Sequence, residues 1–270
     1  MDARSLRTHR GVKPNSIVRV PRAWLVLPTY NEAENIEPLV DAVRAKLPAD
    51  ARVLIVDDNS PDGTGGIADQ LAAEHDDVEV FHRQRKEGLG PAYVAGFRRA
   101  LSAGAELVLE MDSDFSHDPA YLPRLLEAAE RADVVLGSRY VEGGGVSEWG
   151  LLRRAISRGG SAYARLALGI DVRDLTGGFK CFRREVLEAI DLDSIEAQGY
   201  AFQVEMTYRA LEHGFRVVEV PIVFRDRRAG DSKMDRSIVL EAIWRVPLLR
   251  FSGRRPKAPS PRAEQGRYTF

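Results

Sequence analysis

The stretch Leu109-Glu110-Met111-Asp112-Ser113-Asp114-Phe115-Ser116-His117 decides how the rest of the chain is organised. Residues 106–111 are mostly apolar, which predicts a short buried strand. Asp112 and Asp114 follow at positions i and i+2, where side chains of a strand point the same way. Ligands of open α/β sheets bind beyond the carboxyl ends of strands, so this pair suits Mg²⁺ or Mn²⁺ shared with substrate phosphates. The alternative is a turn followed by a helix that Asp118 caps.

The composition indicates an ordinary soluble globular protein. A chain of 270 residues suits one well-cored domain with appendages or two small domains. Hydrophobic residues make up 44% and charged residues 29%, both of which are typical of soluble domains. The single Cys181 excludes a disulfide framework and fits a reducing compartment, and no His/Cys cluster suggests a zinc site.

Both ends of the chain are basic, and we divide the chain into four segments. We expect a loosely ordered basic segment over residues 1–22, a catalytic domain over 23–235, an amphipathic helix over 236–252 and a basic tail over 253–270. Basic tails are either solvated or attracted to an anionic membrane surface. Neither end carries a secretory signal or an apolar run of about 18 residues, so we expect no membrane-spanning segment.

Strand and helix patterns alternate through the first half of the chain. Strands are predicted over residues 23–27, 53–56, 78–81, 106–111 and 134–136, and helices over 33–47, 65–73, 90–102 and 119–131. This alternation predicts a mostly parallel sheet covered by helices on both faces.

The alternation breaks after Gly137. We expect a glycine-centred turn over residues 174–182, a helix over 202–212 and an extended segment over 215–224. Two further helices, over 151–168 and 238–251, mix arginines with apolar residues. Such helices lie at a membrane interface or pack on the core with their arginines outward.

Polar clusters follow four of the predicted strands. Pro28, Tyr30 and Glu32 follow the first strand and could contact a base and a ribose, although Thr29 with Glu32 also matches a helix-capping box. Asp57, Asp58 and Asp62 follow the second, where carboxylates can accept hydrogen bonds from ribose hydroxyls or a base N–H. Turn formation explains Pro61 and Gly63 in this segment, but it does not explain three acids.

The other two clusters are the Asp112/Asp114 pair and residues 137–140, where Arg139 places a permanent cation near the expected phosphates. Together the four clusters predict a nucleoside-diphosphate site in which acids hold the nucleoside and a metal holds the diphosphate. The glycine spacing of a dinucleotide-binding fold and the lysine of a P-loop are both missing.

The motifs resemble those of family 2 glycosyltransferases in their order and spacing, and more narrowly those of dolichol- or polyprenol-phosphate mannose synthases. They are Pro-Thr-Tyr-Asn-Glu (28–32), Val-Asp-Asp-Asn-Ser-Pro-Asp-Gly-Thr (56–64), Met-Asp-Ser-Asp-Phe-Ser-His (111–117) and Gly-Ser-Arg-Tyr (137–140). Residues 174–180, 199–205, 224–227 and 232–234 extend the similarity, which covers residues 23 to about 250.

The resemblance implies a GT-A fold and an inverting transfer of mannose from GDP-mannose to a polyprenyl monophosphate. By position, Pro28, Tyr30, Glu32, Asp57 and Asp112 would hold the nucleotide, while Asp114 would bind the metal with Asp112 beside it. Ser116 stands where relatives often carry Gln, so it could reach the metal only through its hydroxyl or a water.

A lipid phosphate is already an anionic nucleophile, so the reaction needs no general base. The chain accordingly has no Glu-Asp dipeptide, which supplies that base in many related enzymes, and no Gln-x-x-Arg-Trp signature of processive synthases. Catalysis would then rest on positioning and charge neutralisation, with Asp112, Asp114 and Arg139 as the catalytic residues.

Two further groups are candidates for phosphate binding. Arg225, Arg227 and Lys233 could hold donor or acceptor phosphate, or form a solvated charged loop. Thr176, Gly177, Gly178 and Lys180 could form a cradle of N–H groups for the acceptor phosphate, or the glycines could simply shape a turn.

Because a polyprenyl phosphate stays in the bilayer, we expect a peripheral protein on the cytoplasmic face of the membrane, which could recruit a membrane-embedded partner protein. The alternatives are a polyprenyl-phosphate glucosyltransferase that uses UDP-glucose, and a non-catalytic sugar-nucleotide-binding subunit. The intact acids and Arg139 argue against the latter. Nucleic acid is not an expected partner, since the basic ends lack interleaved aromatic residues.

Overall fold

The computed structural model describes residues 22–195, 197–226 and 244–250. The elements are, in chain order, β1 (Ala23–Thr29), α1 (Ile36–Arg44), β2 (Arg52–Asp57), α2 (Thr64–Glu74), β3 (Val78–His82), α3 (Leu89–Ser102), β4 (Leu107–Glu110), a 3₁₀ turn (Pro119–Tyr121), α4 (Leu122–Ala129), β5 (Val134–Ser138), β6 (Gly145–Val146), α5 (Leu151–Leu168), β7 (Lys180–Arg183), α6 (Arg184–Ala189), a 3₁₀ turn (Leu192–Ser194), α7 (Gly199–Glu212), β8 (Val217–Pro221) and β9 (Val223–Phe224).

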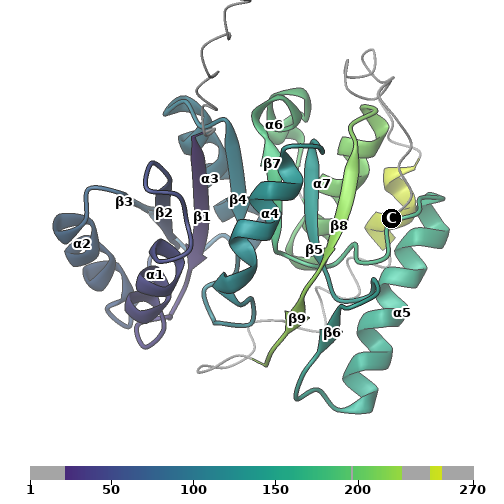
Figure 1. Cartoon of the computed structure of the whole chain (residues 1–270), viewed down its shortest axis with the longest axis horizontal. Coiled ribbons are helices and arrows are strands. Elements are labelled where there is room, and N and C mark those ends of the chain that lie inside the picture. The colour runs from purple at the N-terminus through teal and green to yellow at the C-terminus, as the bar shows by residue number, and fades with distance from the viewer. Residues whose placement is uncertain (1–21, 196, 227–243, 251–270) are drawn as a thin grey trace, which may run out of the picture.

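A seven-stranded sheet with the order β3-β2-β1-β4-β7-β5-β8 forms the centre of the molecule (Figure 1). Every strand pair in it is parallel except the two that β7 makes with β4 and β5. The expectation of a mostly parallel sheet is therefore confirmed. The strands β6 and β9 pair separately as a short parallel ribbon.

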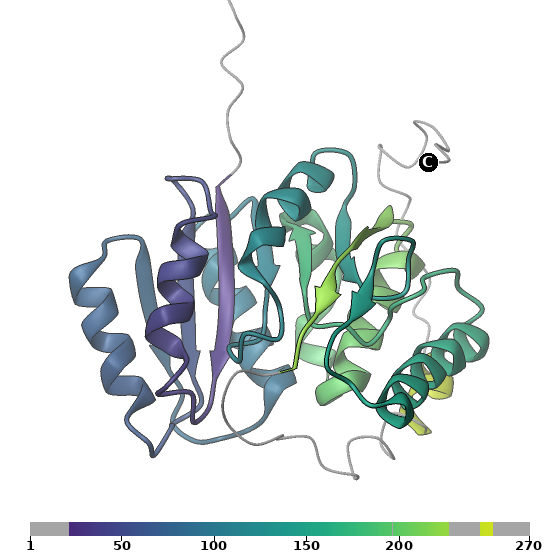
Figure 2. The same ribbon diagram turned by 60° about the horizontal axis from the view of Figure 1, so that its bottom comes forward.

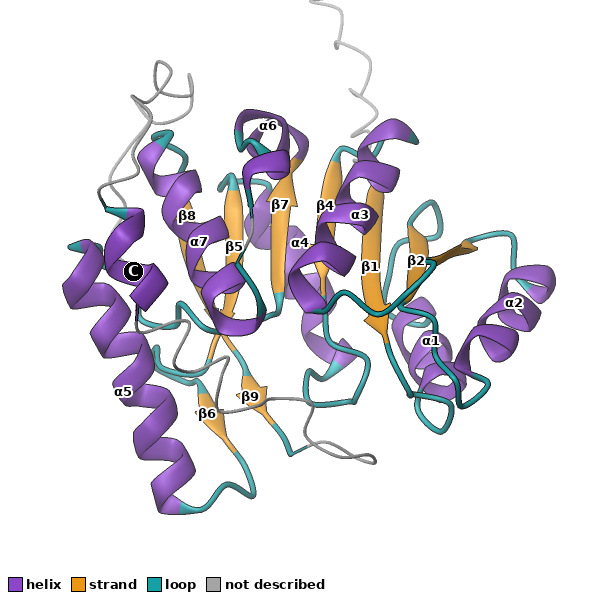
Figure 3. Ribbon diagram, turned by 180° about the vertical axis from the view of Figure 1, so that it is seen from behind, coloured by secondary structure: helices purple, strands orange, loops and turns teal. Residues whose placement is uncertain are grey.

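Helices cover both faces of this sheet. The helices α1, α2 and α4 pack on the face turned toward the viewer in Figure 1, and α3, α6 and α7 pack on the opposite face, which Figure 3 shows. The strand β1 shows why both faces need cover, because Trp24 and Val26 enter one core while Leu25 and Leu27 enter the other. Strands that are apolar on both faces are typical of such sheets.

The prediction of a turn over residues 174–182 is wrong at its end, because Lys180–Arg183 forms β7. This strand enters the middle of the sheet, where Cys181 packs into one core and Phe182 into the other. A four-residue strand that begins two residues after Gly178 has too few residues for its own periodicity to identify it. Its partners β4 and β5 lie far away in the sequence, and pairing with them specifies the strand.

The strand-end clusters meet at one edge of the sheet. The register aligns Thr29 with Asp57 and Val26 with Glu110, so β1, β2 and β4 end close together. This carboxyl edge is the lower edge in Figure 1, and Figure 2 turns it toward the viewer. Asp118 also caps the 3₁₀ turn that precedes α4, as the sequence indicates. Its side chain accepts a hydrogen bond from the Ala120 amide at 2.9 Å.

The helix predicted over residues 151–168 is α5, and it lies at the β8 end of the sheet. Of the helix predicted over 238–251, residues 244–250 are described, and 244–249 are helical. This short helix packs beside α5, where Val246 is buried and Arg250 Nη1 donates to Ala167 O at 3.3 Å (Figure 2). Arg227 and Lys233 lie outside the described residues. Within the described part of the chain, no helix has both the length and the apolarity that crossing a bilayer requires.

Candidate functional site

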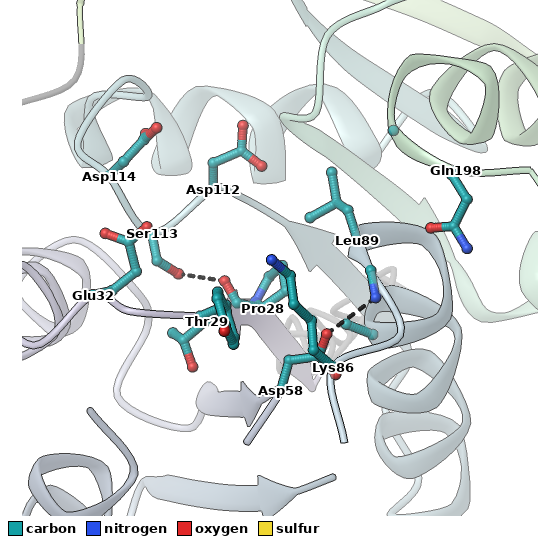
Figure 4. Close-up of a pocket in the computed structure, with 14 residues that line it drawn as sticks. Pro28, Thr29, Glu32, Asp58, Lys86, Leu89, Asp112, Ser113, Asp114 and Gln198 are labelled. Carbon is teal, nitrogen blue, oxygen red and sulfur yellow. Dashed lines mark hydrogen bonds between the residues drawn. The ribbon is translucent and has the colours of Figure 1, made fainter. Parts of the chain in front are cut away.

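A cavity of about 280 Å³ opens at the carboxyl edge of the sheet (Figure 4). The ends of β1, β2 and β4 form one side of it, and the loop before α3 and the start of α7 form the other. Its lining consists of Pro28, Thr29, Tyr30, Glu32, Asp58, Lys86, Gly88, Leu89, Ala92, Asp112, Ser113, Asp114, Gln198 and Gly199. Six of the residues predicted from the sequence are therefore brought together here: Pro28, Tyr30, Glu32, Asp58, Asp112 and Asp114.

The turn after β4 presents Asp112 and Asp114 to this cavity. Figure 4 shows both carboxylates pointing to the same side. Ser113 Oγ donates to Pro28 O at 2.8 Å, which ties the turn to β1, and the Ser116 amide donates to Asp114 Oδ1 at 3.0 Å. The Asp112 side chain is 32% exposed, so it remains accessible from the cavity.

The oxygens at this turn fit a hard divalent cation. Within the described residues, no cluster of three or more His, Cys, Asp or Glu could cage a metal unaided. Two carboxylates are what Mg²⁺ or Mn²⁺ commonly takes from a protein when substrate phosphates complete its coordination. Ser116 Oγ is buried beside them without a hydrogen-bond partner, so its unused lone pairs fit the same group.

The three acids that follow β2 have different surroundings. Asp58 lines the cavity, where it accepts hydrogen bonds from the Glu87 and Gly88 amides at 3.0 and 3.1 Å. Asp57 is buried and accepts from Ser60 Oγ at 2.6 Å, and Asp62 accepts from Thr64 Oγ1 at 2.6 Å. Asp57 and Asp62 are not among the residues that line the cavity.

Asp62 instead organises the loops around the site. Burial opposes its charge, but hydrogen bonds from Thr64 and from the Ala33 amide outweigh burial and lower the pKa of Asp62. Thr64 Oγ1 in turn accepts from the Glu32 amide at 2.9 Å, which joins the loops after β1 and β2. Thr29 caps no helix, because its hydroxyl donates to Val56 O at 3.3 Å and α1 begins only at Ile36. The capping-box interpretation of Thr29 is therefore wrong.

Arg139 lies just after β5 and is almost fully buried. Its Nε and Nη2 donate to the two oxygens of Asp174 at 2.7 and 2.6 Å, and Nη2 also donates to Thr176 Oγ1 at 2.9 Å. Burial alone would lower the pKa of Arg139, but the Asp174 carboxylate outweighs burial and keeps the pKa above its ordinary value. Arg139 is thus a fixed cation, and the rings of Trp149 and Phe224 lie within 6 Å of it.

A second cavity, of about 140 Å³, lies between α5 and α7. Polar groups of Arg153, Ser157, Thr176 and Tyr200 line it together with the apolar side chains of Trp149, Ile156, Tyr163, Ala164, Val204 and Val246. Thr176 joins this cavity to Arg139 through the hydrogen bond described above. Adjacent residues at the start of α7 line the two cavities, Gly199 the first and Tyr200 the second.

Lys180 lines neither of the two cavities. Its side chain is fully buried, and Nζ donates to Glu110 Oε1 at 3.1 Å and to Gln203 Oε1. The Lys180 backbone pairs with β4 and β5 within the sheet, and Lys180 lines neither cavity, so neither its ammonium nor its backbone is presented as a phosphate cradle there. Gly177 is also buried, with its backbone against Gly137 O.

Arg225 lies on the far side of the Asp114 turn. Its amide donates to Ser116 O at 3.1 Å, and its guanidinium lies 3.3 Å from Asp118. The side chain is 63% exposed, so this cation can reach solvent beside the turn.

Residues 24–191 match the model of glycosyl transferase family 2, which is more than half of the chain. The chain belongs to glycosyltransferase family 2. Two relatives align over most of this family 2 glycosyltransferase. An "Undecaprenyl-phosphate mannosyltransferase" of Micrococcus luteus is 50% identical over 83% of this chain and 92% of its own length. A "Polyprenol monophosphomannose synthase" of Mycolicibacterium smegmatis is 45% identical over 92% of this chain and 94% of its own length.

Solved structures of glucosyl-3-phosphoglycerate synthase from Mycobacterium tuberculosis share the fold. The complex with phosphoglyceric acid gives a TM-score of 0.63 at 20% identity, over 84% of this chain and 80% of that chain. The complex with Mn²⁺, uridine-diphosphate and glucosyl-3-phosphoglycerate gives 0.64 at 19% identity, over 88% and 82%. The expected GT-A fold is thereby confirmed.

Several residues of this family 2 glycosyltransferase that border the site escaped the sequence analysis. Lys86 lies 3.9 Å above the Tyr30 ring, and Gln198 Nε2 donates to Glu87 O at 3.2 Å. Tyr93 Oη donates to Asp112 Oδ1 at 3.2 Å from within the core. Lys86 and Gln198 stand in loops without a motif, and the spacing of Tyr93 on α3 indicates only a core position.

Proposed function

We propose that this glycosyltransferase transfers mannose from GDP-mannose to a polyprenyl monophosphate, with inversion at the sugar and with a divalent metal. The observation that carries the proposal is the Asp112/Asp114 turn, which borders the same cavity as Tyr30 and Asp58. A sugar nucleotide needs carboxylates for a metal at its diphosphate and polar groups for its nucleoside, and this cavity supplies both. The names of the two relatives support mannose and a polyprenyl phosphate.

On the donor side, Tyr30, Glu32 and Asp58 would hold the nucleoside, and Asp112 and Asp114 would hold the metal. A bound Mg²⁺ or Mn²⁺ would neutralise charge on the diphosphate. Ser116 Oγ would contribute directly or through a water. Asp57 and Asp62 would support the nucleoside indirectly, because their hydrogen bonds fix the loop that presents Asp58.

On the acceptor side, the second cavity has the character that a lipid phosphate needs. Arg153, Ser157 and Thr176 would contact the phosphate, with Arg139 behind Thr176, and the apolar lining would receive the first isoprene units. A phosphate oxygen would bond to the anomeric carbon while the bond from that carbon to the diphosphate breaks. The nucleophile is already anionic, so no general base is required.

The first test is transfer of radiolabelled sugar to polyprenyl phosphate in detergent, from GDP-mannose or UDP-glucose, with and without Mg²⁺ or Mn²⁺. We expect a metal-dependent mannolipid, with turnover in Asp114→Ala reduced by at least about 10²-fold. A glucolipid would overturn the donor but keep the mechanism. Absence of product from both donors while nucleotide still binds would leave a non-catalytic binding subunit.

We further propose that the protein docks on the cytoplasmic face of a membrane through α5 and the helix at residues 244–249. Leu151, Leu166 and Trp244 are 84%, 82% and 75% exposed, which is unusual for such large apolar side chains. Flotation with anionic vesicles tests this, and Leu166→Ser should weaken binding while Leu101→Ser, on α3, serves as a control away from α5. Binding only in the presence of a membrane protein would point to a membrane-embedded partner instead.

A further inference from the structure

Asp112 is supported from behind by a tyrosine of the core. Tyr93 lies on α3 and is fully buried, and its hydroxyl donates to Asp112 Oδ1 at 3.2 Å. The ring stacks on Phe97 with centroids 5.7 Å apart and on Phe202 with centroids 5.8 Å apart, the latter at an interplanar angle of only 2°. Rings on both sides hold Tyr93 in place, so its hydroxyl is a fixed point for the carboxylate.

A glycine borders the same carboxylate oxygen. A Cβ atom added at Gly178 would lie 3.4 Å from Asp112 Oδ1 and 3.2 Å from Gln203 Nε2. The contact with Gln203 Nε2 is tighter than packed atoms usually show, and the contact with Asp112 Oδ1 is at van der Waals distance, so a side chain at position 178 would fill the space beside the carboxylate. Oδ1 of Asp112 is therefore bordered by the Tyr93 hydroxyl and by the Gly178 backbone.

The Gln203 side chain, which lies next to Gly178, is held by hydrogen bonds of its own. Gln203 is buried on α7, and its Oε1 accepts a hydrogen bond from Lys180, which also bonds Glu110. Glu110 is the last residue of β4 and lies two residues before Asp112, so this hydrogen-bonded group lies next to the turn that carries Asp112. The surroundings of Asp112 can therefore not relax easily in this direction.

We propose that Tyr93 is a positioning residue that sets the orientation of the Asp112 carboxylate for the metal. This inference rests on the metal site of the proposed function. A carboxylate whose torsion is already fixed needs less reorganisation when the ion binds, and outer contacts of this kind typically change metal affinity by about 10- to 100-fold. Tyr93 is not among the residues that line the cavity, so it would act on the ion only through Asp112.

The test is Mn²⁺ binding to the full-length protein in the presence of GDP, measured from the electron paramagnetic resonance signal of free Mn²⁺. Tyr93→Phe removes only the hydroxyl and keeps the ring stack. We expect it to raise the Kd for Mn²⁺ by about tenfold, the lower end of the range, because one neutral donor is lost. In transfer assays the Mn²⁺ concentration for half-maximal activity should rise equally, while kcat at saturating Mn²⁺ stays within about threefold.

The matched control is Tyr208→Phe, which removes a hydroxyl from a buried tyrosine of the same core and should leave the Kd unchanged. Gly178→Ala approaches the same oxygen from β7's side and should also weaken Mn²⁺ binding, which guards against a folding defect in one variant. Wild-type Mn²⁺ affinity in Tyr93→Phe, with binding lost in Asp114→Asn, would overturn the role of Tyr93 alone. Unchanged Mn²⁺ binding in Asp114→Asn would overturn the metal site and this inference with it.

Discussion

Lys180 and Arg139 are two buried cations at the same end of the sheet, yet their surroundings differ. Each is paired with a buried carboxylate, Glu110 for Lys180 and Asp174 for Arg139. Among the described residues, the hydrogen-bond partners of Lys180 Nζ are buried, and Glu110 Oε2 has no hydrogen-bond partner. Arg139 also donates a hydrogen bond to Thr176, and Thr176 lines the cavity between α5 and α7.

The comparison teaches that a buried cation is a candidate for function when one of its hydrogen-bond partners lines a cavity that a substrate could enter. Burial lowers the pKa of Lys180 and opposes its charge, so the pair with Glu110 costs desolvation and supplies mainly specificity of packing. The Arg139 pair has the same cost, but it also keeps a fixed positive potential beside a cavity. We therefore expect variants of the first pair to change stability and variants of the second to change turnover.

The largest effect should come from breaking the buried ion pair between Lys180 and Glu110. Lys180→Met leaves Glu110 buried without its cation, so we expect the free energy of unfolding to fall by about 3–5 kcal/mol. Urea denaturation followed by circular dichroism measures this. The double variant Lys180→Met/Glu110→Gln removes both charges and should recover a large part of the loss. Equal stability of the single and double variants would show that the charge pair is not what holds this region.

Arg139→Lys should act mainly on turnover. Lysine keeps the positive charge but cannot bond both oxygens of Asp174 and Thr176 at once. We expect kcat/KM for sugar transfer to fall on the order of 10²-fold, as when one preorganised donor is lost from an active site. Arg184→Lys, on α6 and far from both cavities, is the matched control. A large loss of stability with unchanged kcat/KM would make Arg139 a structural cation like Lys180.

The sequence indicates the position of Arg139 at the carboxyl edge of the sheet but does not reveal the buried position of Lys180, for a physical reason. Arg139 directly follows an apolar strand, so its position at the carboxyl edge can be inferred from local pattern alone. Lys180 comes two residues after the Gly177-Gly178 pair, and this sequence fits either an open phosphate cradle or the start of a strand. Only the pairing of β7 between β4 and β5 turns the Lys180 side chain toward Glu110, and local periodicity contains no information on that pairing.

The cavity at the carboxyl edge of the sheet shows the same division between residues that local pattern places and residues that only tertiary structure places. Residues that directly end a strand, such as Tyr30, Asp58 and Asp112, could be assigned from the alternation of strands and helices. Gln198 could not, because it comes from a segment about 140 residues beyond Asp58 that only the folded chain brings near. Asp57 and Asp62 were placed in the right loop, but their hydrogen bonds to neighbouring hydroxyls depend on turn geometry that spacing does not reveal.

His82 is the exposed counterpart of the two buried cations and should show the smallest effect. Its Nε2 lies 2.9 Å from Asp69 and its Nδ1 lies 3.3 Å from Asp57, and the side chain is 46% exposed. The hydrogen bond with Asp69 is the main cause that raises the pKa of His82, and the one with Asp57 adds to it. The protonated ring can donate to both carboxylates, whereas the neutral ring has only one N–H.

The sign of the pH dependence follows from the raised pKa. The stabilisation should be fully present below about pH 6.5, the ordinary pKa of histidine, and should disappear as the pH rises through the higher pKa of the folded protein. Urea denaturation of wild type and His82→Gln at about pH 6 and about pH 9 measures it, and the stability difference should be larger at the lower pH. A difference that is constant across this range would mean that the neutral ring makes the same contacts. Exposure and salt screening would then have removed the ionic contribution that the two buried pairs retain.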